Sequence, residues 1–222
     1  MIPRRHDLEL FLKQVEIFRR LDAAARTCLA DAARERAFGK GETLFEEGQP
    51  ADSVWLVRTG RVHLLHYAPG GQVQTTCIMT VGESFCCLPT LDRGTYPATA
   101  VAAVPATILQ IPLRAFHEVL SKTPAMLQET LGIFCQRLRQ VEAKGCLAHD
   151  PVELRVAQAL LTLRKKFGET IPLTRQEIAE LAGTTVETVI RTVSRFQQEG
   201  WVRSGRGRLQ LLDPDALQRL LA

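Results

Sequence analysis

The segment Leu173–Phe196 constrains the fold of this chain most strongly, because it contains two short helical patterns joined at Gly183. The first pattern opens with Thr174 and Glu177, a spacing at which the two side chains can cap the same helix start reciprocally. The apolar residues that follow recur at helical spacing. Because glycine commonly ends a helix, the pattern predicts two separate helices with a tight turn between them.

The second helical pattern is amphipathic. Glu187, Ile190 and Arg191 lie three and four residues apart and therefore share one face. An apolar stripe lies on the opposite face: Val186, Val189, Val193 and Phe196. Two short helices with polar groups on the free face of the second are typical of a helix-turn-helix that binds DNA. The alternative is an ordinary helical hairpin with a solvated charged face.

The next segment, Gly200–Leu211, argues against an ordinary hairpin. It consists of two short apolar runs around a turn rich in glycine and arginine, which predicts a β-hairpin wing directly after the second helix. Arg203, Arg206 and Arg208 lie where the tip of such a wing meets DNA phosphates. Phosphate contacts add affinity and salt dependence but carry no sequence information.

Composition excludes several other classes of protein. The 222 residues carry a net charge of +4, which permits nucleic-acid binding without demonstrating it. The sequence has no apolar run of about 18 residues, and no secretory signal, so we expect no membrane partner and a cytoplasmic location. The six cysteines follow no disulfide or zinc-finger spacing. Phosphate loops, nucleophile elbows and zinc-protease motifs are absent from the sequence, so we expect no enzymatic activity.

Upstream of the helical half, the chain is rich in β-type patterns. Residues Asp7–Arg36 alternate apolar and charged positions at helical period and predict two short helices. Short β-rich runs punctuated by glycine then follow from Phe38, and the last of them, over Thr99–Ile111, ends at Pro112. Short strands at regular spacing predict an antiparallel barrel or sandwich.

From Pro124 the pattern becomes helical over a long stretch that ends before Asp150-Pro151. Apolar residues recur there at alternating steps of four and three: Leu127, Leu131, Phe134, Leu138 and Val141. Such a heptad seam joins two helices, so these residues predict a dimer interface. A helix packed on its own core would show the same stripe, and that alternative stays open.

The order of β-roll, long helix and winged helix-turn-helix resembles the Crp/Fnr family of bacterial transcription regulators over essentially the whole chain. The markers are the spaced glycines Gly41, Gly48 and Gly60, the pair Gly82-Glu83, and residues 173–212. The resemblance implies that an effector binds the β-roll and that the long helices pair. It also implies that the two second helices enter successive major grooves of a palindromic operator, with RNA polymerase as a further partner.

The resemblance implies that Glu187 and Arg191 contact bases. A carboxylate can accept a hydrogen bond from cytosine, a guanidinium can bind guanine, and Ile190 offers an apolar contact to a thymine methyl. The residues that we predict to contact DNA are Arg175, Thr185, Glu187, Thr188, Ile190, Arg191, Arg195, Arg206 and Arg208.

For the effector, the family pattern is only partly matched. Cyclic-nucleotide binders of the family use Gly-Glu for the ribose and Arg-Ser for the phosphate. Gly82-Glu83 and Arg93 are present here, but Gly94 stands at the serine position. The hydroxyl pair that the family places near adenine is replaced by Gln140-Val141. We therefore expect an effector other than cyclic AMP.

Cysteines suggest other cofactors. Only Cys28 lies near the N-terminus, which argues against the closely spaced cysteines of an iron–sulfur cluster. The run from Gly82 to Cys86 resembles the carbon-monoxide-sensing haem member, in which the cysteine binds iron, although the matching histidine position is Leu88 here. Haem with Cys86 as ligand, a redox or metal-sensing role for Cys86-Cys87, and plain packing of two small thiols all stay open.

The sequence thus predicts an α+β chain with three parts. Residues 1–122 form an antiparallel, cyclic-nucleotide-binding-like β-roll, residues 123–147 a dimerisation helix, and residues 148–222 a winged helix-turn-helix. The predicted function is that of a homodimeric, DNA-binding transcription regulator, with a cyclic-AMP-responsive regulator or a haem- or gas-binding sensor as alternatives. The predicted effector site comprises Gly82, Glu83, Cys86, Cys87 and Arg93.

Overall fold

The computed structural model describes residues 5–67, 73–147 and 151–221 and divides the chain into two compact units. One unit contains Met1–His66 and Thr76–Leu138, and the other contains Tyr67–Thr75 and Arg139–Ala222. Among the described residues, none of the helices is both long and apolar enough to cross a membrane.

Short helices open the first unit: α1 (Arg5–Gln14), the 3-10 helix η1 (Glu16–Phe18) and α2 (Ala23–Ala32). Asp22 starts α2 by accepting a hydrogen bond from the backbone N–H of Ala25 at 2.7 Å. The prediction of helix as far as Arg36 is wrong, since β1 (Arg34–Phe38) already begins at Arg34. The strand forms there because β8 (Ala106–Pro112) supplies an antiparallel hydrogen-bonding partner, which no local pattern reveals.

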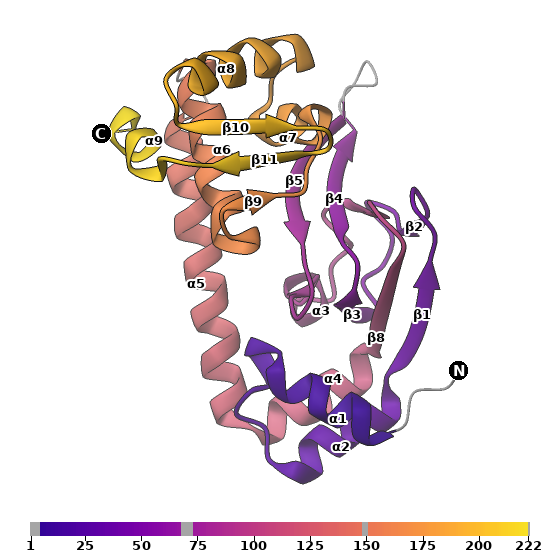
Figure 1. The fold of residues 1–222 in the computed structure, drawn as a ribbon. Helices are drawn as coiled ribbons and strands as arrows, with labels where there is room; N and C mark the ends of the chain where they lie inside the picture. Colours follow the sequence, from indigo (N-terminus) through magenta and orange to yellow (C-terminus); the bar gives the residue numbers. More distant parts are fainter. Residues whose placement is uncertain (1–4, 68–72, 148–150, 222) are drawn as a thin grey trace. The chain divides into compact units, whose positions relative to one another are not determined.

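The predicted antiparallel β-roll is confirmed (Figure 1). It consists of two four-stranded sheets, with strand orders β1-β8-β3-β6 and β2-β7-β4-β5. The remaining strands are β2 (Thr43–Phe45), β3 (Ser53–Thr59), β4 (Val62–Tyr67), β5 (Val73–Met79), β6 (Ser84–Phe85) and β7 (Thr99–Ala102).

Gly60, between β3 and β4, shows why one of the spaced glycines is needed. Its φ of +82° is a conformation that side chains rarely adopt, and an added Cβ would lie 2.5 Å from the carbonyl oxygen of Pro105. The turn therefore requires glycine both for backbone conformation and for space.

Aromatic side chains fill part of the interior of the roll. The rings of Phe45 and Tyr96 stack with their centroids 3.9 Å apart, and Trp55 Nε1 donates a hydrogen bond to the Tyr96 hydroxyl at 3.0 Å. The Tyr96 hydroxyl itself donates to Asp52 Oδ1 at 3.2 Å. Burial raises the pKa of Tyr96 to about 12, so the hydroxyl stays protonated and able to donate.

Two further helices follow the roll along the chain. Helix α4 (Leu113–Lys122) occupies the interval between Pro112 and Pro124, for which the sequence pattern predicts no element. It forms because its buried residues, Phe116 and Val119, pack into the core cluster of the N-terminal helices. Helix α5 (Pro124–Leu147) then follows, and the predicted long helix is confirmed.

The second unit contains the predicted winged helix-turn-helix. Its helices are α6 (Val152–Phe167), α7 (Arg175–Ala182), α8 (Val186–Gln198) and α9 (Pro214–Leu220). The wing strands β10 (Val202–Gly205) and β11 (Arg208–Leu211) pair antiparallel, as predicted, and β9 (Thr170–Ile171) adds a third strand beside β11. Neither β9 nor α9 is predicted by the sequence pattern, because a two-residue strand and a short terminal helix give little periodic signal.

Candidate DNA interface and effector region

The start of α7 has the predicted capping box. The Thr174 side chain accepts a hydrogen bond from the N–H of Glu177, and the Glu177 carboxylate accepts one from the N–H of Thr174 at 2.7 Å. Helix α7 ends at Gly183, which has the left-handed φ and ψ of 60° and 48°. Thr185 then caps α8 by accepting from the N–H of Thr188. Local sequence therefore sets the geometry of the turn.

Helix α8 buries the predicted apolar stripe and exposes the predicted polar face. Val189, Val193 and Phe196 are buried. Ile190 keeps 48% of its surface exposed, and Glu187 and Arg191 are also exposed. Helix α8 therefore exposes one apolar side chain between an acidic and a basic one.

The polar side chains at the start of α8 form a local network. The hydroxyls of Thr185 and Thr188 lie 3.0 Å apart, and Arg191 Nη2 lies 3.4 Å from Thr188 Oγ1. Hydrogen bonds from the backbone N–H of Glu187 and from Thr185, together with the charge of Arg191, hold the pKa of Glu187 below its usual value. Glu187 is thus an acceptor and Arg191 a donor, one helical turn apart.

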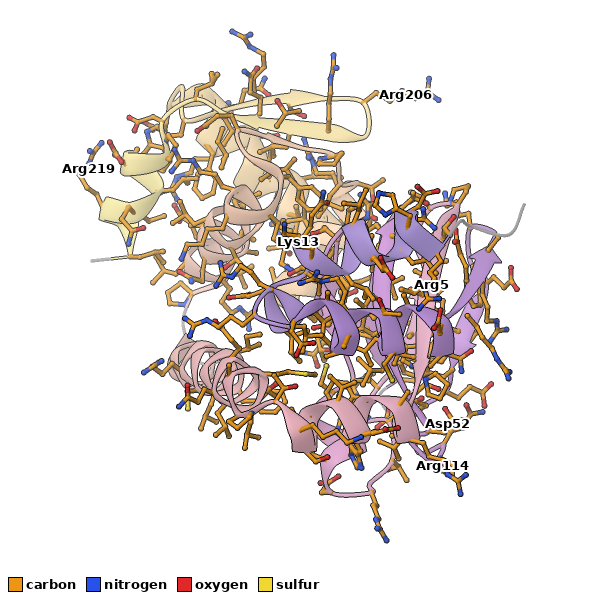
Figure 2. The ribbon with its side chains drawn as sticks, turned by 90° about the horizontal axis from the view of Figure 1, so that it is seen from below. Arg5, Lys13, Asp52, Arg114, Arg206 and Arg219 are labelled. Atoms are coloured by element: carbon orange, nitrogen blue, oxygen red, sulfur yellow. The ribbon has the colours of Figure 1, made fainter. Side chains whose placement is uncertain are left out.

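The wing carries three exposed arginines: Arg203, Arg206 and Arg208. Arg206 occupies the two-residue turn between β10 and β11, and its side chain extends from the tip of the hairpin into solvent (Figure 2). This placement agrees with a role in phosphate contacts.

Two other arginines that we predict to contact DNA bind residues of the same unit instead. Arg175, at the start of α7, donates to the hydroxyl of Ser204 in β10, and burial lowers its pKa. Arg195, near the end of α8, forms an ion pair with Glu153 of α6, with 2.6 Å between Nη2 and Oε1. Sequence reasoning missed Glu153 and Ser204 because their partners lie 42 and 29 residues away.

The predicted effector residues lie around β6 and the short helix α3 (Leu88–Leu91). Glu83 accepts hydrogen bonds from the backbone N–H and hydroxyl of Thr80, at 2.7 and 2.8 Å, within the turn that contains Gly82. Arg93 is exposed. In this conformation Glu83 binds its own turn and Arg93 faces solvent.

Cys86 and Cys87 are both buried, but in different places. Cys86 belongs to the core cluster inside the roll, whereas Cys87 belongs to the cluster formed with the N-terminal helices. Adjacent thiols on opposite sides of the backbone cannot form a disulfide with each other without rearrangement. Among the described residues, no cluster of three or more histidine, cysteine or acidic side chains could hold a metal ion.

Segment 86–93 is also strained. Cys86 and Arg93 have φ values of 59° and 57°, and they are the non-glycine residues with positive φ in the part of the chain that the structure describes. Such conformations cost about 1–3 kcal/mol each and persist where the surroundings enforce them.

The predicted dimer seam divides between exposed and partly buried residues. Leu127, Leu131 and Leu138 are 44%, 53% and 60% exposed on α5. Phe134 is partly buried against the core cluster of the N-terminal helices, so its own subunit already uses part of its surface. The side chain of Val141, like Gln140 beside it, lies outside the described residues.

Comparison with known proteins decides the family. A family model described as "Crp-like helix-turn-helix domain" matches residues 154–220, and one described as "Cyclic nucleotide-binding domain" matches residues 35–123. The chain belongs to the Crp/Fnr family. Within that family it is a transcription regulator with a DNA-binding helix-turn-helix.

Relatives of this Crp/Fnr regulator have names of different kinds. The cyclic AMP receptor protein of Thermus thermophilus is 29% identical over 189 residues, which cover 84% of this chain and 88% of the relative. Transcriptional activator protein FnrA of Stutzerimonas stutzeri is also 29% identical over 189 residues, covering 81% of this chain and 77% of the relative. This regulator is therefore equally identical to a protein named for cyclic AMP and to an activator whose name mentions no effector.

Among solved structures, FixK2 from Bradyrhizobium japonicum superposes with a TM-score of 0.78 at 22% identity. The match covers 86% of this chain and 98% of FixK2. This likeness shows that the Crp/Fnr fold extends through both the β-roll and the winged helix-turn-helix.

Proposed function

We propose that this Crp/Fnr regulator binds a palindromic operator as a homodimer, with α8 in the major groove and the wing on the phosphate backbone. The observation that carries the proposal is the exposed face of α8. Glu187 and Arg191 lie one turn apart there, while Val189, Val193 and Phe196 bury the opposite face. A helix anchored in this way presents fixed hydrogen-bonding groups to base edges.

The exposed leucines of α5 support the homodimer. Met126 and Thr130 are fully buried, and the Thr130 hydroxyl donates to the carbonyl oxygen of Met126 at 2.7 Å, so one face of the helix packs on its own subunit. Leu127, Leu131 and Leu138 remain exposed. Burying a leucine is worth roughly 1.5–3 kcal/mol, so pairing two such stripes supplies a clear driving force for association.

Selection from a random duplex pool tests the DNA-binding proposal. The full-length protein should enrich an inverted repeat whose half-sites are centred about one helical turn, or a multiple of one turn, apart. Sequencing of the bound pool measures this directly. Enrichment of a single unrepeated motif would argue against a symmetric dimer, and a pool with no motif would refute sequence-specific binding.

For the effector, we propose a molecule other than cyclic AMP, sensed by the loop Ser84–Asp92 that contains Cys86-Cys87. Two features support this. Gly94 stands where a cyclic-nucleotide site needs a serine hydroxyl, and a buried polar group left without its partner costs about 1–3 kcal/mol. The strained Cys86 lies inside the loop and the strained Arg93 directly follows it, and strain is often retained where a segment changes conformation.

The alternative of cyclic AMP rests on the Thermus relative, whose name gives it a cyclic AMP receptor function. Haem bound by Cys86 is a further alternative. Because Cys86 is 7% exposed, binding of iron or oxidation of the thiol would require the loop to move first. A sensor built on this cysteine would thus couple its chemistry to a change in the loop.

A further inference from the structure

The ion pair between Arg195 and Glu153 occupies the side of α8 that faces the start of α6. Arg195 Nη1 donates to Glu153 Oε2 at 2.7 Å, and Nη2 lies 2.6 Å from Oε1. The Glu153 side chain is 23% exposed and that of Arg195 is 57% exposed. Because Glu153 stands in the first turn of α6, the positive end of that helix also favours its carboxylate.

A hollow of about 250 Å³ adjoins this ion pair. It is lined by Glu153, Thr188, Arg191, Thr192 and Arg195. The four residues from α8 are spaced by three, one and three positions, so they share one side of the helix. Two guanidinium groups and two hydroxyls are the donors that proteins use for phosphate oxygens, and Glu153 is the acidic group among them.

We propose that Glu153 determines sequence specificity by withholding Arg195 from the DNA backbone. Its carboxylate holds the guanidinium in an intramolecular ion pair and repels a phosphate that approaches the hollow. Arg195 is then a positioning residue that ties α8 to α6, and not the DNA contact that the sequence predicts. The proposal rests on the DNA-binding role of α8 stated above.

The physical reason lies in the difference between specific and non-specific binding. Phosphate contacts strengthen binding to every DNA sequence. Whether a regulator occupies its operator depends on the ratio of its affinities for operator and random DNA. Retaining one arginine per subunit in an internal pair removes a phosphate contact that would favour all sequences equally. The base contacts of Glu187 and Arg191 then make up a larger share of the affinity.

The test replaces the carboxylate by an isosteric amide, Glu153→Gln, in the full-length protein. Affinity for a random duplex and for the selected operator is measured over a series of salt concentrations. Glu169→Gln is a matched control, because Glu169 pairs with Arg164 at 2.8 Å in the same unit but near the other end of α6. Both variants lose one negative charge and free one arginine.

For Glu153→Gln, the plot of log affinity against log salt on random DNA should steepen by about one per subunit, as expected for one added phosphate contact. Affinity for random DNA should rise roughly twofold to fivefold per subunit, the factor by which an exposed ion pair of typical strength competes with a phosphate contact. The ratio of operator to random affinity should fall. Glu169→Gln should show neither change, and in an Arg195→Gln background Glu153→Gln should no longer steepen the slope.

Either of two results would overturn the proposal. One is a Glu153→Gln variant that changes random-duplex affinity no more than Glu169→Gln does. The other is a lower salt slope for Arg195→Gln with an unchanged slope for Glu153→Gln, since Arg195 would then already contact phosphate in the wild type. Failure of sequence-specific binding itself would appear separately, as a wild type that enriches no motif, because the slopes are measured on random DNA.

Discussion

Arg191 occupies the centre of the exposed face of α8, where it lies 3.4 Å from the Thr188 hydroxyl and adds its charge to the surroundings of Glu187. Arg208, in contrast, stands in the exposed wing hairpin. The two arginines therefore differ in what they can do, although both are exposed cations. In the proposed complex, a side chain on a helix whose opposite face is buried would be held in register with bases, whereas one on the wing hairpin would contact the phosphate backbone.

Substituting each arginine by alanine separates the two roles. Arg191→Ala should cost about 1–3 kcal/mol on the operator and relax the preference at one position per half-site. Arg208→Ala should weaken all sequences alike and flatten the salt slope by about one. Binding of operator and random duplexes over a series of salt concentrations measures the sequence preference and the salt slope of each variant. A wing variant with altered sequence preference, together with an Arg191→Ala variant altered only in salt slope, would refute these roles.

Gly60 gives a prediction about stability at the same scale. Gly60→Ala should destabilise the first unit by more than the roughly 1–2 kcal/mol that a left-handed alanine costs, since the new Cβ would also meet Pro105 O at 2.5 Å. Gly48→Ala is the matched control, because Gly48 has the same φ of +82° and open space around it. Thermal unfolding measures the stability of both variants. Equal losses of stability would show that the contact with Pro105 adds nothing to the cost of the backbone conformation.

At the scale of elements, α5 uses two faces for two purposes. Met126 and Thr130 are completely buried, while Leu127, Leu131 and Leu138 leave their apolar surface in water. A helix of this kind leaves apolar surface in contact with water when the chain is a monomer. The exposed face supports pairing with a second copy of α5.

Introducing a charge tests the pairing. Leu138→Glu should produce monomers that bind DNA poorly, because a charge in the seam would cost several kcal/mol in the dimer. Gln128→Glu adds the same charge to an exposed position outside the leucine stripe and should leave the dimer intact. Sedimentation measures the assembly state, and a dimeric Leu138→Glu variant would show that the seam is wrongly assigned.

At the scale of the whole molecule, regulation of the proposed dimer requires that the effector favours one of its arrangements. Coupling of this kind is reciprocal, so an effector that raises operator affinity tenfold must bind the DNA-bound protein tenfold more tightly, equivalent to about 1.4 kcal/mol. The proposed sensing loop and α8 belong to different units. An effector at the loop can therefore change the DNA affinity of α8 only if it shifts the protein between two or more conformations.

Operator binding under defined conditions tests the proposed effector class. Cyclic AMP should leave operator affinity unchanged, whereas Cys86→Ser or Cys87→Ser should change the response of the protein to oxidant or to haem, because each thiol anchors the loop in a core cluster. The measurement compares oxidised and reduced protein, with and without haem. Activation by micromolar cyclic AMP, with both serine variants behaving as wild type, would contradict the proposal.

Elements with local signals follow directly from the order of neighbouring residues. The capping pair Thr174 and Glu177, the turn at Gly183 and the stripe of α8 are contained within 24 residues, and hydrogen bonds between near neighbours enforce them. Apart from β1, the strands of the roll follow from short β-rich runs between turns, and the long helix α5 follows from the helical spacing of its apolar residues. The exposed leucines of α5 were visible in the same way.

Contacts between distant segments determine which charged groups pair and which core each thiol enters. The pairing of Arg195 with Glu153 joins residues 42 positions apart, and the separation of Cys86 from Cys87 depends on which core lies on each side of β6. Strand β1 likewise exists because β8 provides its partner. Each of these outcomes depends on segments brought together by folding, and a pattern of neighbouring residues carries no record of such distant contacts.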